Sequence, residues 1–210
     1  MKTLFGAAAL ALTLAVAPAY AATTFAQYEQ VDGGLDTIQF DSGLLTDTGG
    51  TTGSLVLFNY LNTMPAGLDG NIDAYMNVSS TGAPWSGTIS FLRASDSANL
   101  LTLTFSGATL AGGGGSGALF GSTPGGTVTY TSDFLDFTGQ SAGDFSLALS
   151  GITPGFGASF WSGDSTGTFA SDSGGGPNVV PEPGTWTMMI LGFGGVGALM
   201  RRRRQALALA

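Results

Sequence analysis

The sequence predicts an all-β fold, a single antiparallel β-sandwich or jelly-roll-like domain, in the central part of a 210-residue chain. Two observations point to this class. Short runs of alternating apolar and polar residues recur along the chain, and clusters of Gly, Ser, Thr, Asn and Asp separate them. No central stretch shows a convincing 3.6-residue apolar period, so we expect no helices there. Short strands at fairly regular spacing favour an antiparallel sandwich.

Nine segments are expected to form strands. The run at residues 54–60 is apolar on both faces, which is typical of a central strand. Four more runs alternate clearly, at residues 71–78, 88–93, 99–105 and 144–149. Weaker patterns lie at residues 25–31, 37–40, 127–131 and 167–170. The glycine-rich run at 112–117 is expected to be a flexible connection and not the interior of a strand.

Residues 1–21 have the layout of a secretory signal peptide. Lys2 supplies the positive end, residues 4–17 the apolar centre, and an A-x-A pattern that ends at Ala21 the cleavage site. The mature chain is therefore expected to begin with a body at residues 22–170. A Gly- and Ser-rich linker, 171–179, is expected to follow it.

The body is strongly acidic. Residues 22–180 contain thirteen acidic side chains and a single basic one, Arg93, which gives a formal charge of −12. A surface without a basic patch cannot neutralise phosphates, so nucleic acid is excluded as a partner. The chain has no cysteine, so no disulfide supports an exported fold and the core must do so alone. About 160 residues suffice for one such core.

The C-terminal segment, residues 180–205, has a different pattern. Pro181, Glu182 and Pro183 precede Trp186, and residues 186–200 carry no charge. As a helix this run would span about 22 Å, short of a hydrocarbon core of about 30 Å. Trp186 suits one membrane interface, and the basic block that follows can snorkel toward the other. This block consists of Arg201, Arg202, Arg203 and Arg204, and its positive charge places the C-terminal end of the helix on the cytoplasmic side. A short transmembrane helix is therefore expected, with the body outside the inner membrane.

The order and spacing of these tail residues resemble the PEP-CTERM sorting signals of Gram-negative bacteria, and more closely their PEPxxWA subgroup. That subgroup usually has Ala after the Trp, where this chain has Thr187. The resemblance covers about thirty residues. It implies that an exosortase, a membrane-embedded cysteine transpeptidase-like enzyme, cuts near the Pro-Glu-Pro. It also implies that the protein is anchored only transiently in the inner membrane and then reaches the cell surface or the extracellular polysaccharide matrix.

Few residues could carry catalysis or hold a cofactor. The chain has no His and no Cys, which excludes Ser-His-Asp triads, thiol nucleophiles and His or Cys metal ligands. Asp133 and Asp136, on either side of Phe134 and Leu135, are the best candidate pair of acids for a glycosidase by proximity, but any acidic loop has the same pattern. Residues 69–73 resemble the start of a calcium loop, but Ala74 and Ser80 stand where a glycine and a carboxylate are needed. We expect no enzyme, no metal and no cofactor.

Trp85 and Trp161 are the candidates for stacking on a glycan, since both lie near predicted loops. A sandwich usually buries its tryptophans, which is the alternative interpretation.

The sequence leaves three candidate functions. The first is an exported, non-enzymatic surface or matrix protein, sorted by an exosortase and associated with exopolysaccharide or biofilm. The second is a secreted carbohydrate-binding module, and the third and least favoured is a secreted glycoside hydrolase.

Overall fold

The computed structural model describes residues 22–31, 35–61, 64–65, 67–123 and 125–172. These residues form eleven strands and no helix, so the all-β prediction is confirmed. The strands are β1 (Thr23–Gln30), β2 (Ile38–Asp41), β3 (Leu44–Asp47), β4 (Ser54–Tyr60), β5 (Ile72–Thr81), β6 (Trp85–Arg93), β7 (Asn99–Gly113), β8 (Ser116–Ser122), β9 (Thr127–Thr131), β10 (Gly143–Thr153) and β11 (Phe160–Ser171).

Each of the nine predicted segments coincides with a strand, and β3 and β8 are the two that the sequence did not predict. The prediction for residues 112–117 was wrong, because β7 continues to Gly113 and β8 begins at Ser116. The physical reason is a close approach that only glycine allows. A Cβ on Gly117 would lie 2.8 Å from the ring of Phe156, and one on Gly112 would lie 2.5 Å from the carbonyl oxygen of Ser116.

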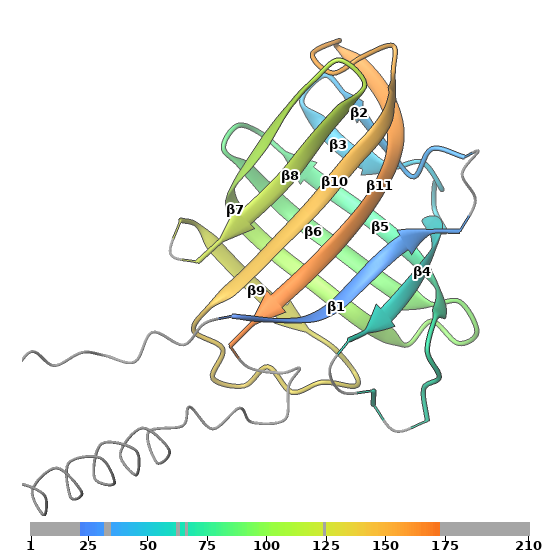
Figure 1. Cartoon of the computed structure of the whole chain (residues 1–210), viewed down its shortest axis with the longest axis vertical. Coiled ribbons are helices and arrows are strands. Elements are labelled where there is room, and N and C mark those ends of the chain that lie inside the picture. The colour runs from blue at the N-terminus through green and yellow to red at the C-terminus, as the bar shows by residue number, and fades with distance from the viewer. Residues whose placement is uncertain (1–21, 32–34, 62–63, 66, 124, 173–210) are drawn as a thin grey trace, which may run out of the picture.

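All strand pairings are antiparallel, and they link the described strands into one sheet that closes on itself. Pairing runs from β1 through β4, β5, β6, β7, β8, β10 and β11, and β11 pairs back with β1. Figure 1 shows the result as two layers whose strands cross, with β8, β10, β11, β1 and β4 in front of β5, β6 and β7. We expected a sandwich; the structure has two layers, but they belong to one continuous sheet.

Two pairs of short strands share the space between β5 and β11. β4 pairs with β5 over residues 72–76, and β3 pairs with the same strand over 79–81. On the other side, β1 pairs with the end of β11 and β2 with its start. The β1–β4 pair and the β2–β3 pair therefore lie end to end in one gap. Within each pair the strands are hydrogen-bonded to each other and to β5 and β11, but among the described strands no pairing joins one pair to the other.

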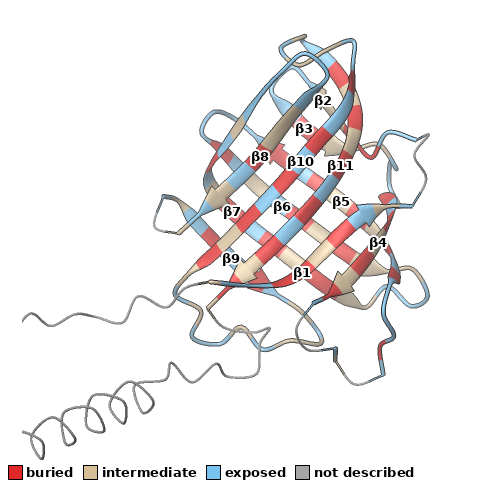
Figure 2. Ribbon diagram, in the orientation of Figure 1, coloured by how far each residue is buried: buried red, intermediate tan, exposed pale blue. Residues whose placement is uncertain are grey.

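The core lies between the two layers, where alternate residues of each strand point inward (Figure 2). Aromatic rings bridge the layers at its centre. The ring of Phe91, on β6, has its centroid 4.9 Å from that of Tyr28, 5.2 Å from that of Phe58 and 5.4 Å from that of Phe169. Such tilted and edge-to-face pairs contribute beyond the area they bury. The acidic body thus has a dense apolar core and needs no disulfide.

The described part of the chain ends just after β11. This strand includes Ser171, the first residue of the predicted linker. Asp172 follows, and its amide donates to the carbonyl of Ala142 at 3.2 Å. The predicted signal peptide (1–21), the remainder of the predicted linker and the sorting tail with its apolar helix (186–200) lie outside the described residues. In the part that is described, no helix has the length and apolarity to span a membrane.

Candidate functional site

The residues predicted to direct sorting all lie outside the described part of the chain. They are Ala21 at the N-terminal side and, in the tail, Pro181, Glu182, Pro183, Trp186, Arg201, Arg202, Arg203 and Arg204. The described residue nearest to the tail is Asp172, just after β11. At that position the carboxylate of Asp172 accepts hydrogen bonds from the amide and the hydroxyl of Ser141, which fastens the end of β11 to the loop before β10.

Trp85 and Trp161 are packing residues in this structure. Trp85 is 7% exposed and Trp161 only 1%. The ring of Phe40 lies between them, with its centroid 6.0 Å from that of Trp85 and 5.5 Å from that of Trp161. Stacking on a sugar requires an exposed ring face. The geometry therefore agrees with the alternative interpretation, in which the fold buries its tryptophans.

Asp133 and Asp136 order the backbone of the loop after β9. The carboxylate of Asp133 accepts the amide of Asn99 at 2.8 Å, and that of Asp136 accepts the amide of Thr138 at 2.8 Å. The hydrogen bonds from Thr138 hold the pKa of the Asp136 carboxyl below its usual range. A glycosidase needs one carboxylic acid whose pKa is raised. The shift at Asp136 has the opposite direction.

The segment that resembles a calcium loop leads into β5. The side-chain amide of Asn59 donates to the side-chain oxygen of Asn71 at 3.1 Å. The backbone amide of Ala94 donates to the backbone carbonyl of Asp73 at 2.9 Å. Among the described residues no group of three or more acidic side chains is placed to hold a metal ion. The segment serves here as a polar entry to a strand.

A concave site lies where the β1–β4 and β2–β3 pairs meet, and we call it the junction pocket. Its volume is about 450 Å³. It is lined by the end of β1, residues 35–37, the start of β2, the β3–β4 turn and the start of β11. Pockets of this size accommodate small molecules. The pocket is a consequence of the topology. It lies at the break in strand pairing between the β1–β4 and β2–β3 pairs.

Ser54 closes one side of the junction pocket with its hydroxyl. The hydroxyl donates to the carbonyl of Thr37 at 2.9 Å and accepts the amides of Thr48 at 3.2 Å and Gly49 at 3.1 Å. Ser54 is 6% exposed, and the amide of Thr48 also donates to the carbonyl of Thr37 at 3.3 Å, so the hydroxyl completes a buried hydrogen-bond network at this turn. They hold the β3–β4 turn against the segment that precedes β2.

A second hydroxyl cluster lies deeper, between the pocket and the core. The hydroxyl of Tyr28 donates to that of Ser165 at 2.9 Å, and the hydroxyls of Ser165 and Thr37 are 2.9 Å apart. Burial raises the pKa of the Tyr28 hydroxyl far above its ordinary value, against the smaller effect of its bond to Ser165. The phenol therefore stays protonated and acts as a structural donor. This cluster gives the pocket a fixed floor.

The sequence analysis did not identify the junction pocket, because its lining comes from four separate stretches of chain. One signal was available. Val31, Leu35, Leu55 and Phe160 are large apolar residues next to polar or turn residues, and all four stay exposed in the fold. The pairing of β1 with β4 brings Val31 beside Leu55, and the pairing of β2 with β11 brings Phe160 to the same end of the sheet.

Comparison with other proteins gives one match, and it lies in the tail. No curated protein and no solved structure matches the chain. Residues 179–204 match the family model of the PEP-CTERM protein-sorting motif. These residues fall within the segment that the sequence analysis identified from its Pro-Glu-Pro, apolar run and arginine block. The chain therefore carries a PEP-CTERM protein-sorting motif, which indicates an exported protein that an exosortase system sorts.

Proposed function

We propose that this protein is a non-enzymatic component of the cell surface or the extracellular matrix, and that an exosortase removes its tail during delivery. The match of residues 179–204 to the sorting motif is the observation that supports this most strongly. The body supports it through its closed sheet and its formal charge of −12, which keeps copies apart in solution.

Each part of the tail has a role in this proposal. Trp186 and the arginine block hold residues 186–200 in the inner membrane for a short time, with the body on the outer side. The exosortase cuts near Pro181, Glu182 and Pro183. The motif is of the PEPxxWA type, with Thr187 in place of the usual Ala. Signal peptidase cuts after Ala21, so both ends of the chain are lost and the mature protein is essentially the body.

The linker explains how the cut site stays accessible. Eight residues, 173–180, lie between Asp172, which is hydrogen-bonded to Ser141 at the end of β11, and Pro181. The residues between them are mostly Gly, Ser, Asn and Pro, a composition that gives reach without a preferred fold. A membrane enzyme can therefore approach the Pro-Glu-Pro without disturbing the sheet.

The non-enzymatic part of the proposal rests on residue chemistry. The chain has neither His nor Cys. The two candidate acids, Asp133 and Asp136, accept backbone hydrogen bonds in the loop after β9. In the matrix the protein associates with exopolysaccharide and contributes to a biofilm. Partial hydrolysis of the extracellular polymer should therefore release it into the medium, and a protein that is already free before hydrolysis would contradict this association.

A producing strain that lacks its exosortase tests the sorting step. The proposal predicts that the uncut protein accumulates in the inner membrane at the mass of the chain from Ala22 to its C-terminus. In the parent strain, replacement of Pro181, Glu182 and Pro183 by alanine should give the same accumulation. The matched control is Glu29→Ala, which removes an acid from the body and should leave sorting unchanged. Normal processing in the deletion strain would refute the proposal.

A further inference from the structure

The junction pocket gathers exposed apolar side chains around one concavity. Among the described residues eight large hydrophobic side chains are exposed, and four of them line this pocket. They are Val31, Leu35, Leu55 and Phe160, with Leu35 71% exposed and Phe160 50%. Single exposed apolar residues are common, whereas a group around one concavity indicates a binding site.

The pocket wall is preorganised by glycines. In the β3–β4 turn a Cβ on Gly49 would lie 1.9 Å from the carbonyl oxygen of Gly53. A Cβ on Gly53, whose φ is +93°, would lie 2.6 Å from the carbonyl oxygen of Met76. The turn therefore folds tightly against β5, and Ser54 fastens it to Thr37. Binding needs no reorganisation of this wall, which favours affinity.

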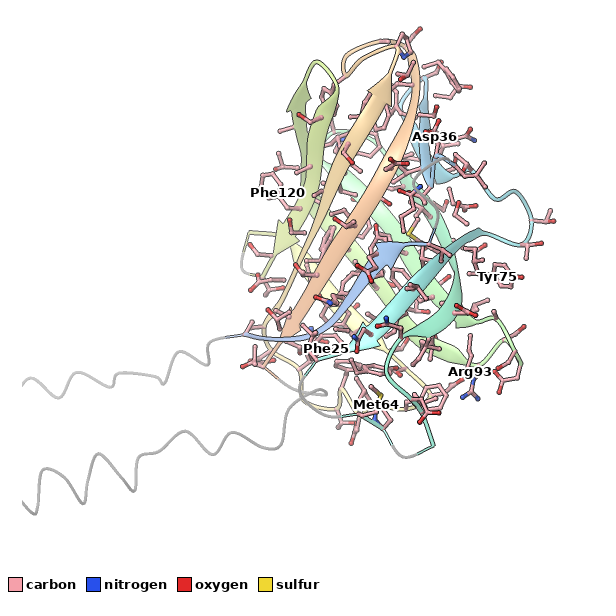
Figure 3. The ribbon with its side chains drawn as sticks, turned by 45° about the vertical axis from the view of Figure 1, so that its right-hand side comes forward. Phe25, Asp36, Met64, Tyr75, Arg93 and Phe120 are labelled. Atoms are coloured by element: carbon pink, nitrogen blue, oxygen red, sulfur yellow. The ribbon has the colours of Figure 1, made fainter. Side chains whose placement is uncertain are left out.

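The charge of the lining has one sign. Among the described residues that line the pocket, Asp36 is the one that carries a charge, and its carboxylate accepts a hydrogen bond from the hydroxyl of Ser162. It lies on the outer side of the sheet, beside β2 (Figure 3). The amide side chains of Gln30 and Gln39 also line the pocket. Since the whole body is acidic as well, an anionic ligand would be repelled at every approach.

We propose that the junction pocket binds a small amphiphile with an apolar body and a cationic head group. The apolar body contacts Leu35, Leu55 and Phe160, and the head group pairs with Asp36. The volume of about 450 Å³ suits a molecule of this kind. The inference is independent of the sorting function, since it uses only residues of the folded body.

A pair of photoreactive probes tests the proposal on the purified full chain. Both carry an octyl chain with a diazirine, and they differ only in the head group, trimethylammonium or sulfate. Each is used well below its micelle concentration, and mass spectrometry maps the labelled residues. The cationic probe should label residues near Val31, Leu55 and Phe160 at least about 3-fold more than the sulfate probe, as expected for one partly exposed ion pair.

Matched variants separate the pocket from the general surface. Phe160→Ser should lower labelling at the pocket by about 5- to 10-fold, because it removes an apolar wall. Phe120→Ser, at a site 44% exposed on β8, should leave it unchanged. Asp36→Asn should lower the preference for the cationic head clearly more than Asp41→Asn, which makes the same change of charge outside the pocket.

Three results would overturn the proposal. The first is labelling confined to the apolar tail at residues 186–200. The second is equal labelling of the pocket by the two probes, which would remove the role of Asp36. The third is a Phe160→Ser variant that labels like the parent while circular dichroism shows it folded.

Discussion

The folded body has two regions that differ in their density of charged side chains. Residues 74–132, the hydroxyl region, cover most of β5 and all of β6 to β9 and carry only two charged residues, Arg93 and Asp96. These two form an ion pair with each other. Residues 22–73 and 133–172, the acidic region, carry the other twelve acids of the body. The sheet is continuous through both, so the fold itself does not require the difference.

The two regions satisfy their polar groups in different ways. In the hydroxyl region the outward side chains of neighbouring strands are in register, as where Thr88 is opposite Thr104 and Thr104 opposite Thr129. In the acidic region carboxylates accept hydrogen bonds from backbone amides near the ends of strands. Asp47 accepts the amides of Gly49 and Val78, both at 3.1 Å. The hydroxyl region thus depends on strand ladders and the acidic region on carboxylates that cap irregular backbone.

The largest effect should come from the core that joins the two regions. Phe91 lies in the hydroxyl region, and its ring contacts Tyr28, Phe58 and Phe169 of the acidic region. Phe91→Ala should lower the free energy of unfolding by about 3–5 kcal/mol through lost burial and a cavity. Urea unfolding measures this. Phe120→Ala, at an exposed site, should change it by less than about 0.5 kcal/mol. Equal losses in the two variants would refute the packing described.

The next effect tests how closely strands approach in the hydroxyl region. A Cβ on Gly87 would lie 2.2 Å from the carbonyl oxygen of Ser79 on the paired strand. Gly87→Ala should therefore force β5 and β6 apart and cost about 2–3 kcal/mol. Gly113 is the matched control, since a Cβ there meets nothing within 4 Å. If Gly113→Ala costs as much as Gly87→Ala, the close approach is not the cause.

A smaller effect is expected at the seam between the regions. The side-chain amide of Gln140 accepts the backbone amide of Tyr130 and donates to the carbonyl of Val128, both at 3.1 Å, and so covers the outer edge of β9. Gln140→Ala should cost about 1–2 kcal/mol and speed amide hydrogen exchange at Tyr130. Gln140→Glu keeps the acceptor for Tyr130 and should retain that protection. Unchanged exchange in Gln140→Ala would contradict the role of this side chain.

The smallest effect concerns pH and the acidic region. Partial burial pushes the pKa of the Asp172 carboxyl up, but hydrogen bonds from Ser141 and from backbone amides outweigh it and hold the pKa below the usual 3.8. A lowered pKa in the folded state means that the ionised group stabilises the protein above pH 3.8 and that this stability is lost as the pH falls further. Asp172→Asn should therefore destabilise the protein more at pH 7 than at pH 3.

Thr104→Val in the hydroxyl region is the control for this pH dependence. Neither side chain titrates, so the difference in stability from the parent should be the same at pH 7 and pH 3. Parallel thermal unfolding of both variants at the two pH values makes the measurement. If Asp172→Asn keeps its full effect at pH 3, the carboxylate clip does not act through its charge.

Strand positions were predictable because alternation encodes them locally. The nine predicted runs include β7 and β10, whose inward residues alternate clearly. β3 begins with two adjacent leucines and so lacks alternation, and glycines obscure the start of β8, so local pattern could not identify either. Closure of the sheet was not predictable. It depends on the pairing of β1 with β11, whose partners are about 140 residues apart in sequence.

The sites divide in the same way. The sorting motif is a contiguous segment whose order and spacing are visible in the sequence, and the family match at residues 179–204 agrees with it. The junction pocket combines residues between 30 and 55 with Phe160 and Ser162, which lie more than 100 residues further along the chain. Trp161 lies next to a turn in sequence, yet Phe40 and Phe156 cover it in the fold. Residues brought together by long-range pairing cannot be recognised from local pattern alone.

The central claim is that the tail is a temporary handle and the acidic sheet is the working protein. The intact mass of the protein recovered from the surface or matrix of producing cells tests it most directly. The account predicts a chain that begins at Ala22 and ends close to Pro181, with or without a covalently attached group. A mass that still includes the segment from Trp186 to Arg204 would contradict it.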